Sequence, residues 1–272
     1  MIKERLDLLV VERRLVESRT KAQWLIKNGF VYVNGIEIRK PGKRIDNSLR
    51  IELTKEFPYV GRGGLKLEAA LKEFSVDING KVCTDIGASV GGFTDCLLKH
   101  NALKVYAIDT ALDLLHPSLR CDKMKNRVIP LLGVDARELK ILKEKVDICT
   151  IDVTFTSLKA ILPNVRRFLK NDGGIIALIK PLFETEYIQK LTIVKYNKIQ
   201  SKDLFRSTEK NRYKNIVKGL VRWCIGENFF PYGVMRSPSI SKKESIEFFI
   251  YLKIDKPSSN FDFRNEVNNL LL

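Results

Sequence analysis

From Lys81 onward the chain alternates short apolar runs, rich in β-forming residues, with helical segments. The runs are VCTDIGA from Val82, KVYAID from Lys104, RVIPLLG from Arg127, VDICTID from Val146 and GGIIALIK from Gly173. Alternation of this kind predicts a parallel, doubly wound α/β sheet with strands buried on both faces.

The run from Gly173 ends in Lys180, which is followed by Pro181. In open α/β sheets, ligands bind at the carboxyl ends of the strands, so Lys180 is a candidate functional residue. Alternatively, it is a surface lysine whose stem lies along the protein. Lys66 is a second candidate, because a cation in the first turn of the helix predicted after Gly64 opposes the helix dipole.

The turn after the first strand reads DIGASVGGFTD, from Asp85 to Asp95. Glycines let the backbone pass close to a ligand, and the following helix offers free N–H groups. The sequence allows a dinucleotide site or an S-adenosylmethionine site. The spacing G-x-x-x-G-G differs from the dinucleotide fingerprint G-x-G-x-x-G, which favours S-adenosylmethionine.

Three carboxylates, Asp85, Asp109 and Asp135, follow three successive strands, and such side chains can accept hydrogen bonds from ribose hydroxyls and an adenine amino group. Each alone is better explained as a helix N-cap, but together they favour a nucleoside pocket. The residues expected to bind the cofactor are Asp85, Gly87, Ala88, Ser89, Gly91, Gly92, Phe93, Asp109, Asp135 and Ala136.

The first 57 residues predict a small α+β unit. Helical spacing, with Ser18 as a candidate N-cap, predicts two short helices, and Asn34-Gly35 predicts a β-hairpin. This order of elements resembles the alpha-L RNA-binding module of ribosomal proteins. The residues expected to contact RNA are Arg5, Arg13, Arg14, Arg19, Lys21, Lys27, Arg39, Lys40, Lys43, Arg44 and Arg62; alternatively, they form the solvated face of a dimerisation domain.

Composition agrees with a polyanionic partner. The 272 residues carry 48 Lys and Arg against 32 Asp and Glu, a formal net charge of +16. The alternative is a lysine-rich surface that serves solubility. No apolar run reaches bilayer-spanning length and the N-terminus does not read as a signal peptide, so we expect a cytoplasmic protein. The five scattered cysteines predict reduced thiols, with neither a disulfide framework nor a structural metal.

The glycine turn, DICTIDVTFTSL and ALIKPLFE, joined to the RNA-binding module, resemble the TlyA family of ribosomal RNA ribose methyltransferases, historically called haemolysins. Their catalytic domain is like that of FtsJ. The resemblance implies a Rossmann-like domain, S-adenosylmethionine as cofactor, ribosomal RNA or ribosomal subunits as partner, and cytidine as the modified nucleotide. It also implies a catalytic tetrad, which falls on Lys66, Asp152, Lys180 and Glu247.

The resemblance sets the expected domains at residues 1–57, a linker at 58–64, a methyltransferase domain at 65–255 and a tail at 256–272. The chain departs from the family pattern at Val90, where threonine is usual, at Leu182, where glutamine is usual, and in the stretch after Glu184, which lacks a glycine-rich basic turn.

Methylating a ribose 2′-hydroxyl requires removal of its proton, and positioning in line with the methyl donor. Lys180 can accept that proton only when neutral; otherwise it orients the hydroxyl and water takes the proton. The sequence therefore allows three functions: an RNA methyltransferase, a catalytically inactive RNA-binding protein and a membrane-active haemolysin.

Overall fold

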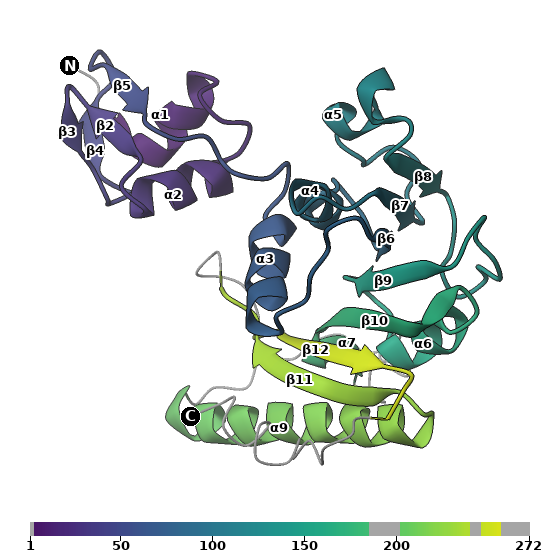
Figure 1. Ribbon diagram of the computed structural model, residues 1–272. Helices are drawn as coiled ribbons and strands as arrows, with labels where there is room; N and C mark the ends of the chain where they lie inside the picture. The colour runs from purple at the N-terminus through teal and green to yellow at the C-terminus, as the bar shows by residue number, and fades with distance from the viewer. Residues whose placement is uncertain (1–2, 185–201, 240–245, 257–272) are drawn as a thin grey trace. The chain divides into compact units, whose positions relative to one another are not determined.

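The computed structural model describes residues 3–184, 202–239 and 246–256, and for 202–211 only the backbone helix. Residues 185–201 of the stretch that departs from the family pattern, and most of the tail, lie outside these ranges. The chain divides into two compact units, the first ending at Arg62 and the second beginning at Gly63 (Figure 1).

The first unit has two short helices and two small sheets. The elements are β1 (Lys3–Arg5), α1 (Leu6–Glu12), α2 (Arg19–Lys27), β2 (Val31–Val33), β3 (Ile36–Glu37), β4 (Arg44–Asp46) and β5 (Ile51–Leu53). β1 pairs with β4, and the second sheet has the order β3-β2-β5.

Sequence signals explain the local structure of this unit. The Ser18 hydroxyl accepts a hydrogen bond from the Lys21 N–H and so caps α2, as predicted. Asn34 and Gly35 both have positive φ, 47° and 78°, which the tight β2–β3 turn requires, so the predicted hairpin is confirmed.

The second unit is built on a seven-stranded sheet with the order β11-β12-β10-β9-β6-β7-β8. Its strands are β6 (Val82–Ile86), β7 (Lys104–Asp109), β8 (Val128–Leu132), β9 (Val146–Ile151), β10 (Leu169–Ile179), β11 (Phe230–Arg236) and β12 (Phe248–Lys253). The strands from β6 to β10 are parallel, which confirms the prediction, and β12 is antiparallel to both of its neighbours.

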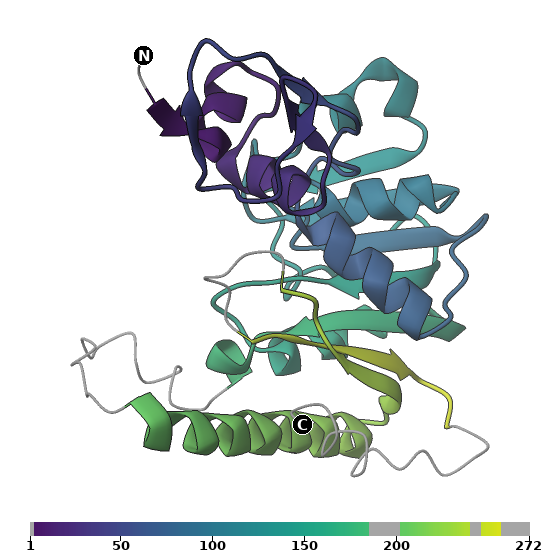
Figure 2. The ribbon, with the colours of Figure 1, turned by 90° about the vertical axis from the view of Figure 1, so that its left-hand side faces the viewer.

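Helices cover both faces of the sheet (Figures 1 and 2). On one face lie α3 (Gly63–Glu73) and α4 (Gly92–Lys99); on the other lie α6 (Leu158–Val165) and α9 (Lys202–Gly226). Strand alternation creates this division: Val82 and Ile86 of β6 join the core beneath α6 and α9, whereas Asp85 bonds Thr94 of α4. The short α7 (Pro181–Glu184) and α5 (Pro117–Arg120) follow β10 and β7.

Strand order reverses at β6. From β6 the chain moves outward to β7 and β8, then returns to place β9 and β10 on the other side of β6. The helices that follow β6 and β9, α4 and α6, therefore lie on opposite faces, and in open α/β sheets this switch point forms the ligand crevice.

Candidate active site

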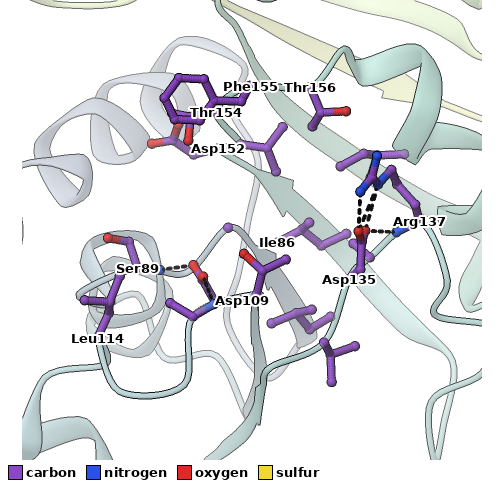
Figure 3. Close-up of a pocket in the computed structure, with 18 of the residues that line it drawn as sticks. Ile86, Ser89, Asp109, Leu114, Asp135, Arg137, Asp152, Thr154, Phe155 and Thr156 are labelled. Carbon is purple, nitrogen blue, oxygen red and sulfur yellow. Dashed lines mark hydrogen bonds and ion pairs between the residues drawn. The ribbon is translucent and has the colours of Figure 1, made fainter. Parts of the chain in front are cut away.

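A cavity of about 640 Å³ lies at this edge (Figure 3), within the range typical of small-molecule sites. Each parallel strand contributes a residue at or just beyond its end: Gly87 for β6, Asp109 for β7, Asp135 for β8, Asp152 for β9 and Lys180 for β10. Residues far apart in the sequence therefore meet because their strands are parallel neighbours.

The glycine turn packs directly against the loop that carries Asp152. Gly87 has φ 82°, and a Cβ there would lie 2.3 Å from the Asp152 carbonyl oxygen. The Asp152 N–H also donates to the Ile86 carbonyl at 2.9 Å. Glycine is required at this position because any side chain would push the Asp152 loop away from the turn.

Asp109 faces the cavity with its carboxylate oriented by two backbone groups (Figure 3). Its Oδ2 accepts from the Ser89 N–H at 2.7 Å, and its Oδ1 accepts from the Ala111 N–H at 2.8 Å. Each carboxylate oxygen has a second lone pair, so both can still accept from a ligand hydroxyl.

Asp135 also lines the cavity, but it is engaged by a residue that the sequence analysis missed. Its oxygens accept from Arg137 Nε at 3.0 Å and Nη2 at 2.5 Å (Figure 3). These hydrogen bonds hold the pKa of the Asp135 carboxyl below its usual value. The sequence carries a signal for this pair, since Arg137 stands two positions after the strand-end Asp135.

Asp85 differs from the other two strand-end carboxylates, because it is fully buried within β6. It accepts from the Thr94 N–H at 2.8 Å and the Thr94 hydroxyl at 2.6 Å, and so ties the strand to α4. Burial raises the pKa of Asp85 to about 7.

The residues expected to bind the cofactor fall into two groups in the structure. Those that line the cavity are Gly87, Ser89, Asp109, Asp135 and Ala136; those that do not line it are Asp85, Ala88, Gly91, Gly92 and Phe93.

The four residues of the expected tetrad form two ion pairs. Lys180 Nζ lies 2.5 Å from Asp152 Oδ1, and both side chains line the cavity. Lys66 Nζ lies 2.7 Å from Glu247 Oε2, with each side chain 11% exposed. Ile179 pairs with Phe248 across β10 and β12, so Glu247 is adjacent to Lys180 at the end of the sheet. Neither Lys66 nor Glu247 lines the cavity.

The loop between β9 and α6 forms one wall of the cavity and was not anticipated from the sequence. Thr154, Phe155 and Thr156 all line it (Figure 3). Phe155 has a left-handed backbone, φ 61°, and is 87% exposed, with its ring 5.3 Å from that of Phe183. An exposed aromatic residue in a strained conformation at a cavity is a feature of functional loops.

In the first unit, several arginines expected to contact RNA have structural partners. Arg5 and Arg19 each lie 2.9 Å from the buried carboxylate of Asp7, and Gln23 donates to it at 2.7 Å. Arg13 donates to the carbonyl oxygens of Leu49 and Asn47. These contacts hold the unit together.

The other cations of the same set are exposed, except Lys21, whose side chain is only 12% exposed. Lys21 pairs with Glu17 at 2.5 Å, Arg39 pairs with Glu37, and Arg44 donates weakly to a backbone carbonyl. Side chains that are exposed and have no ion-pair partner among the described residues are those of Arg14, Lys27, Lys40 and Lys43. Arg62 is also exposed.

Two negative findings concern only the described part of the chain. No helix there is long and apolar enough to cross a membrane. Nor do those residues contain a group of three or more His, Cys, Asp or Glu side chains placed to hold a metal ion.

A mostly parallel seven-stranded sheet, with carboxylates and a glycine turn around a cavity at its switch point, is the architecture of a Rossmann-like methyltransferase. Residues 59–254 match the FtsJ-like methyltransferase family, and residues 4–51 match the S4 domain. The chain therefore belongs to the FtsJ-like methyltransferase family, and its methyl donor is S-adenosylmethionine.

Relatives and solved structures agree with this assignment. The chain is 38% identical to a candidate rRNA methyltransferase, YqxC of Bacillus subtilis, over 92% of its own length and 85% of the relative's. It is 36% identical to the 16S/23S rRNA (cytidine-2'-O)-methyltransferase TlyA of Mycobacterium tuberculosis, over 66% of its own length and 68% of the relative's. A structure of a candidate hemolysin from Streptococcus thermophilus superposes with a TM-score of 0.66 at 30% identity, covering 99% of this chain and 96% of that one.

Proposed function

We propose that this protein methylates a ribose 2′-hydroxyl in ribosomal RNA, on a cytidine, in the cytoplasm where ribosomes are assembled. The Lys180–Asp152 ion pair in the cavity wall is the observation that carries the proposal. Support for the substrate comes from the S4 domain and from relatives named as rRNA (cytidine-2'-O)-methyltransferases.

The residues around the cavity fit S-adenosylmethionine. Asp109 presents oriented acceptors for two ribose hydroxyls. Asp135, whose oxygens accept from Arg137, lines the same cavity. Apolar side chains that line the same cavity suit the faces of a purine ring: Ile86, Ile108, Leu114 and Val134. Gly87 and Ser89 place the backbone beside the same space.

S-adenosylmethionine supplies a methyl group on a positively charged sulfur. The task of the chain is to hold the ribose 2′-oxygen in line with it and to remove the hydroxyl proton. We assign this task to Lys180, either as the proton acceptor or as the group that orients the hydroxyl, and Asp152 fixes its Nζ at the cavity wall.

Lys66 and Glu247 would support Lys180 from beside the neighbouring strand β12. Their ion pair joins α3 to the start of β12, and the register of β12 against β10 places it beside the end of β10. We assign these two residues the role of fixing the strand that carries Lys180, and of balancing charge around it.

The first unit would dock on folded RNA through its exposed cations. Arg14, Lys27, Lys40 and Lys43 are open to phosphates, whereas Arg5, Arg13 and Arg19 already hold the unit together. The proposed domain limits stay at 1–57 for RNA binding and 65–255 for catalysis, joined by residues 58–64.

Methylation mapping tests the proposal. Ribose 2′-O-methylation is mapped across the ribosomal RNA of cells that lack the protein, and of the same cells complemented with wild type or Lys180→Ala. We expect methylation at one or more cytidines with wild type only. RNA binding without wild-type-dependent methylation would indicate an inactive RNA-binding protein. Lysis of liposomes by the purified protein, again without methylation, would favour the haemolysin alternative.

A further inference from the structure

Glu184 has a specific set of partners that the proposed chemistry does not use. It lies at the end of α7, four positions after Lys180. Its Oε2 accepts from the Ser157 hydroxyl at 2.5 Å, and its Oε1 accepts from the Leu158 N–H at 2.8 Å. Ser157 in turn accepts from the Lys159 N–H at 3.1 Å, so one carboxylate completes the N-terminal cap of α6.

Glu184 and Ser157 belong to the two segments that build the Lys180–Asp152 ion pair. One segment, 152–157, begins with Asp152, and the other, 180–184, begins with Lys180. The segments are connected three times in order along their length: by the Asp152–Lys180 ion pair, by the ring contact of Phe155 with Phe183, and by the Ser157–Glu184 hydrogen bond.

Glu184 is largely buried, and groups that favour its ionised form surround it. Desolvation by burial raises the pKa of Glu184, while the Leu158 N–H, the Ser157 hydroxyl and the positive charge of Lys159 favour the carboxylate. A carboxylate at a helix N-terminus is also favoured by the helix dipole. Among the described residues, Cys224 of α9 is a further titratable neighbour that interacts with it.

We propose that Glu184 is a positioning residue: it fixes the 152–157 segment against the 180–184 segment and thereby sets the place of Lys180 relative to Asp152 in the cavity. The inference rests on the proposed function, because the geometry that it protects is that of ribose methylation. Besides this connection, the ion pair and the contact of the largely exposed Phe155 with Phe183 join the two segments in the part of the chain that the structure describes. A displacement of about 1 Å at a reacting group can lower a rate about 100-fold.

Single-turnover methylation of rRNA tests the assignment with three variants. Glu184→Ala removes both acceptors, Ser157→Ala removes one partner, and Glu184→Gln retains a carbonyl for the Leu158 N–H and an amide that can donate to Ser157. We expect Glu184→Ala to lower the rate constant about 10- to 100-fold with the dissociation constant of S-adenosylmethionine within about twofold of wild type. Glu184→Gln should retain most of the wild-type rate constant.

Ser157→Ala, Glu184→Ala and the double variant together form a double-mutant cycle. If the two side chains act as one connection, the double variant should lose no more rate than Glu184→Ala alone. If Glu184→Ala does not fold, Ser157→Ala carries the test, and a wild-type rate in it overturns the assignment. A wild-type rate in folded Glu184→Ala overturns it equally.

Asp147→Ala is the matched control, since Asp147 also accepts a backbone N–H, from Val82 at 2.9 Å, but lies at the opposite edge of the sheet. It should lower the melting temperature without lowering the rate constant. An equal loss of rate in this variant would mean that general destabilisation explains the Glu184 effect.

Hydrogen–deuterium exchange separates this inference from the proposed function. Glu184→Ala should speed exchange across residues 152–159 and leave the glycine turn at residues 87–92 unchanged. If wild type methylates no rRNA, the proposed function fails, and exchange alone decides whether Glu184 holds the two segments together. Unchanged exchange at residues 152–159 overturns the assignment.

Discussion

Lys180 and Asp152 extend from the ends of neighbouring parallel strands, and their charged groups lie 2.5 Å apart with side chains 15% and 24% exposed. Both residues line the cavity, so a substrate hydroxyl that enters it meets a cation already held in place by a carboxylate. Pre-orientation of this kind removes the need to order the lysine during the reaction.

Replacement of Lys180 should separate its two possible roles. Lys180→Ala should lower the single-turnover rate of rRNA methylation at least about 100-fold while cofactor affinity persists. Lys180→Arg retains the charge and hydrogen-bond donors but cannot act as a base. The measurement is the rate against pH: a lysine base gives a rate that rises with pH and levels off once the amine is neutral.

Substantial activity of Lys180→Arg would exclude the base and leave orientation of the hydroxyl. Lys140→Ala provides a control, since Lys140 is exposed and does not line the cavity. If Lys180→Ala methylates rRNA as fast as Lys140→Ala, Lys180 has no role in the chemistry.

Asp109→Ala should weaken binding of S-adenosylmethionine, because the variant loses acceptors for the ribose hydroxyls. Hydrogen bonds to a charged group contribute about 1.5 to 3 kcal/mol each, which corresponds to at least about tenfold in affinity. Isothermal titration calorimetry measures the change. Asp113→Ala is the control from the same loop, where Asp113 is exposed and pairs with Arg120. If the two variants bind S-adenosylmethionine with equal affinity, Asp109 does not contribute to cofactor binding.

Charge reversal at Lys40 and Lys43 should weaken rRNA binding without unfolding the first unit. Both are exposed and have no ion-pair partner among the residues described. The slope of the logarithm of affinity against that of salt should fall by about 1 per lost phosphate contact. Arg13→Glu, by contrast, should destabilise the unit, because its guanidinium holds the Leu49 and Asn47 carbonyls. Salt-independent loss of binding at Lys40 and Lys43 would speak against phosphate contacts.

The buried carboxyl of Asp85 should make the second unit less stable as pH rises. Its pKa is raised by burial to about 7, whereas an unfolded aspartate titrates near pH ~3.9. The stability contribution of the protonated form is therefore complete below pH ~4 and is lost as pH rises through about 7. Urea unfolding followed by Trp223 fluorescence, with Trp24 replaced by Phe, should show this slope in wild type but not in Asp85→Asn.

Asp7 should show the opposite dependence in the first unit. Burial acts to raise its pKa, but the hydrogen bonds from Arg5, Gln23 and Arg19 outweigh it and lower the value to about 2. Its stabilising contribution is complete above pH ~4 and is lost as pH falls through about 2. Unfolding followed by Trp24 fluorescence, with Trp223 replaced by Phe, should differ between wild type and Asp7→Asn in the direction opposite to Asp85→Asn.

The sequence by itself determined the features that depend on neighbours along the chain. Apolar runs alternating with helical segments predicted the parallel sheet, and Asn34-Gly35 predicted the hairpin turn. Lys180 and Asp152 end consecutive apolar runs of the sequence, and they meet because the carboxyl ends of parallel strands share one edge. Local propensity and strand direction are sufficient for such inferences.

Only the tertiary structure decided which side chains are available at the site. Asp85 and Asp109 look alike in the sequence, but Asp85 lies inside β6 on the face toward α4, whereas Asp109 ends β7 and faces the cavity. Likewise, Arg13 is occupied by carbonyl groups more than 30 positions along the chain, and Glu184 is bonded to Ser157, 27 positions before it. Such pairings depend on how distant segments pack, because burial and hydrogen bonding, and not residue type alone, decide whether a polar group is free for a ligand.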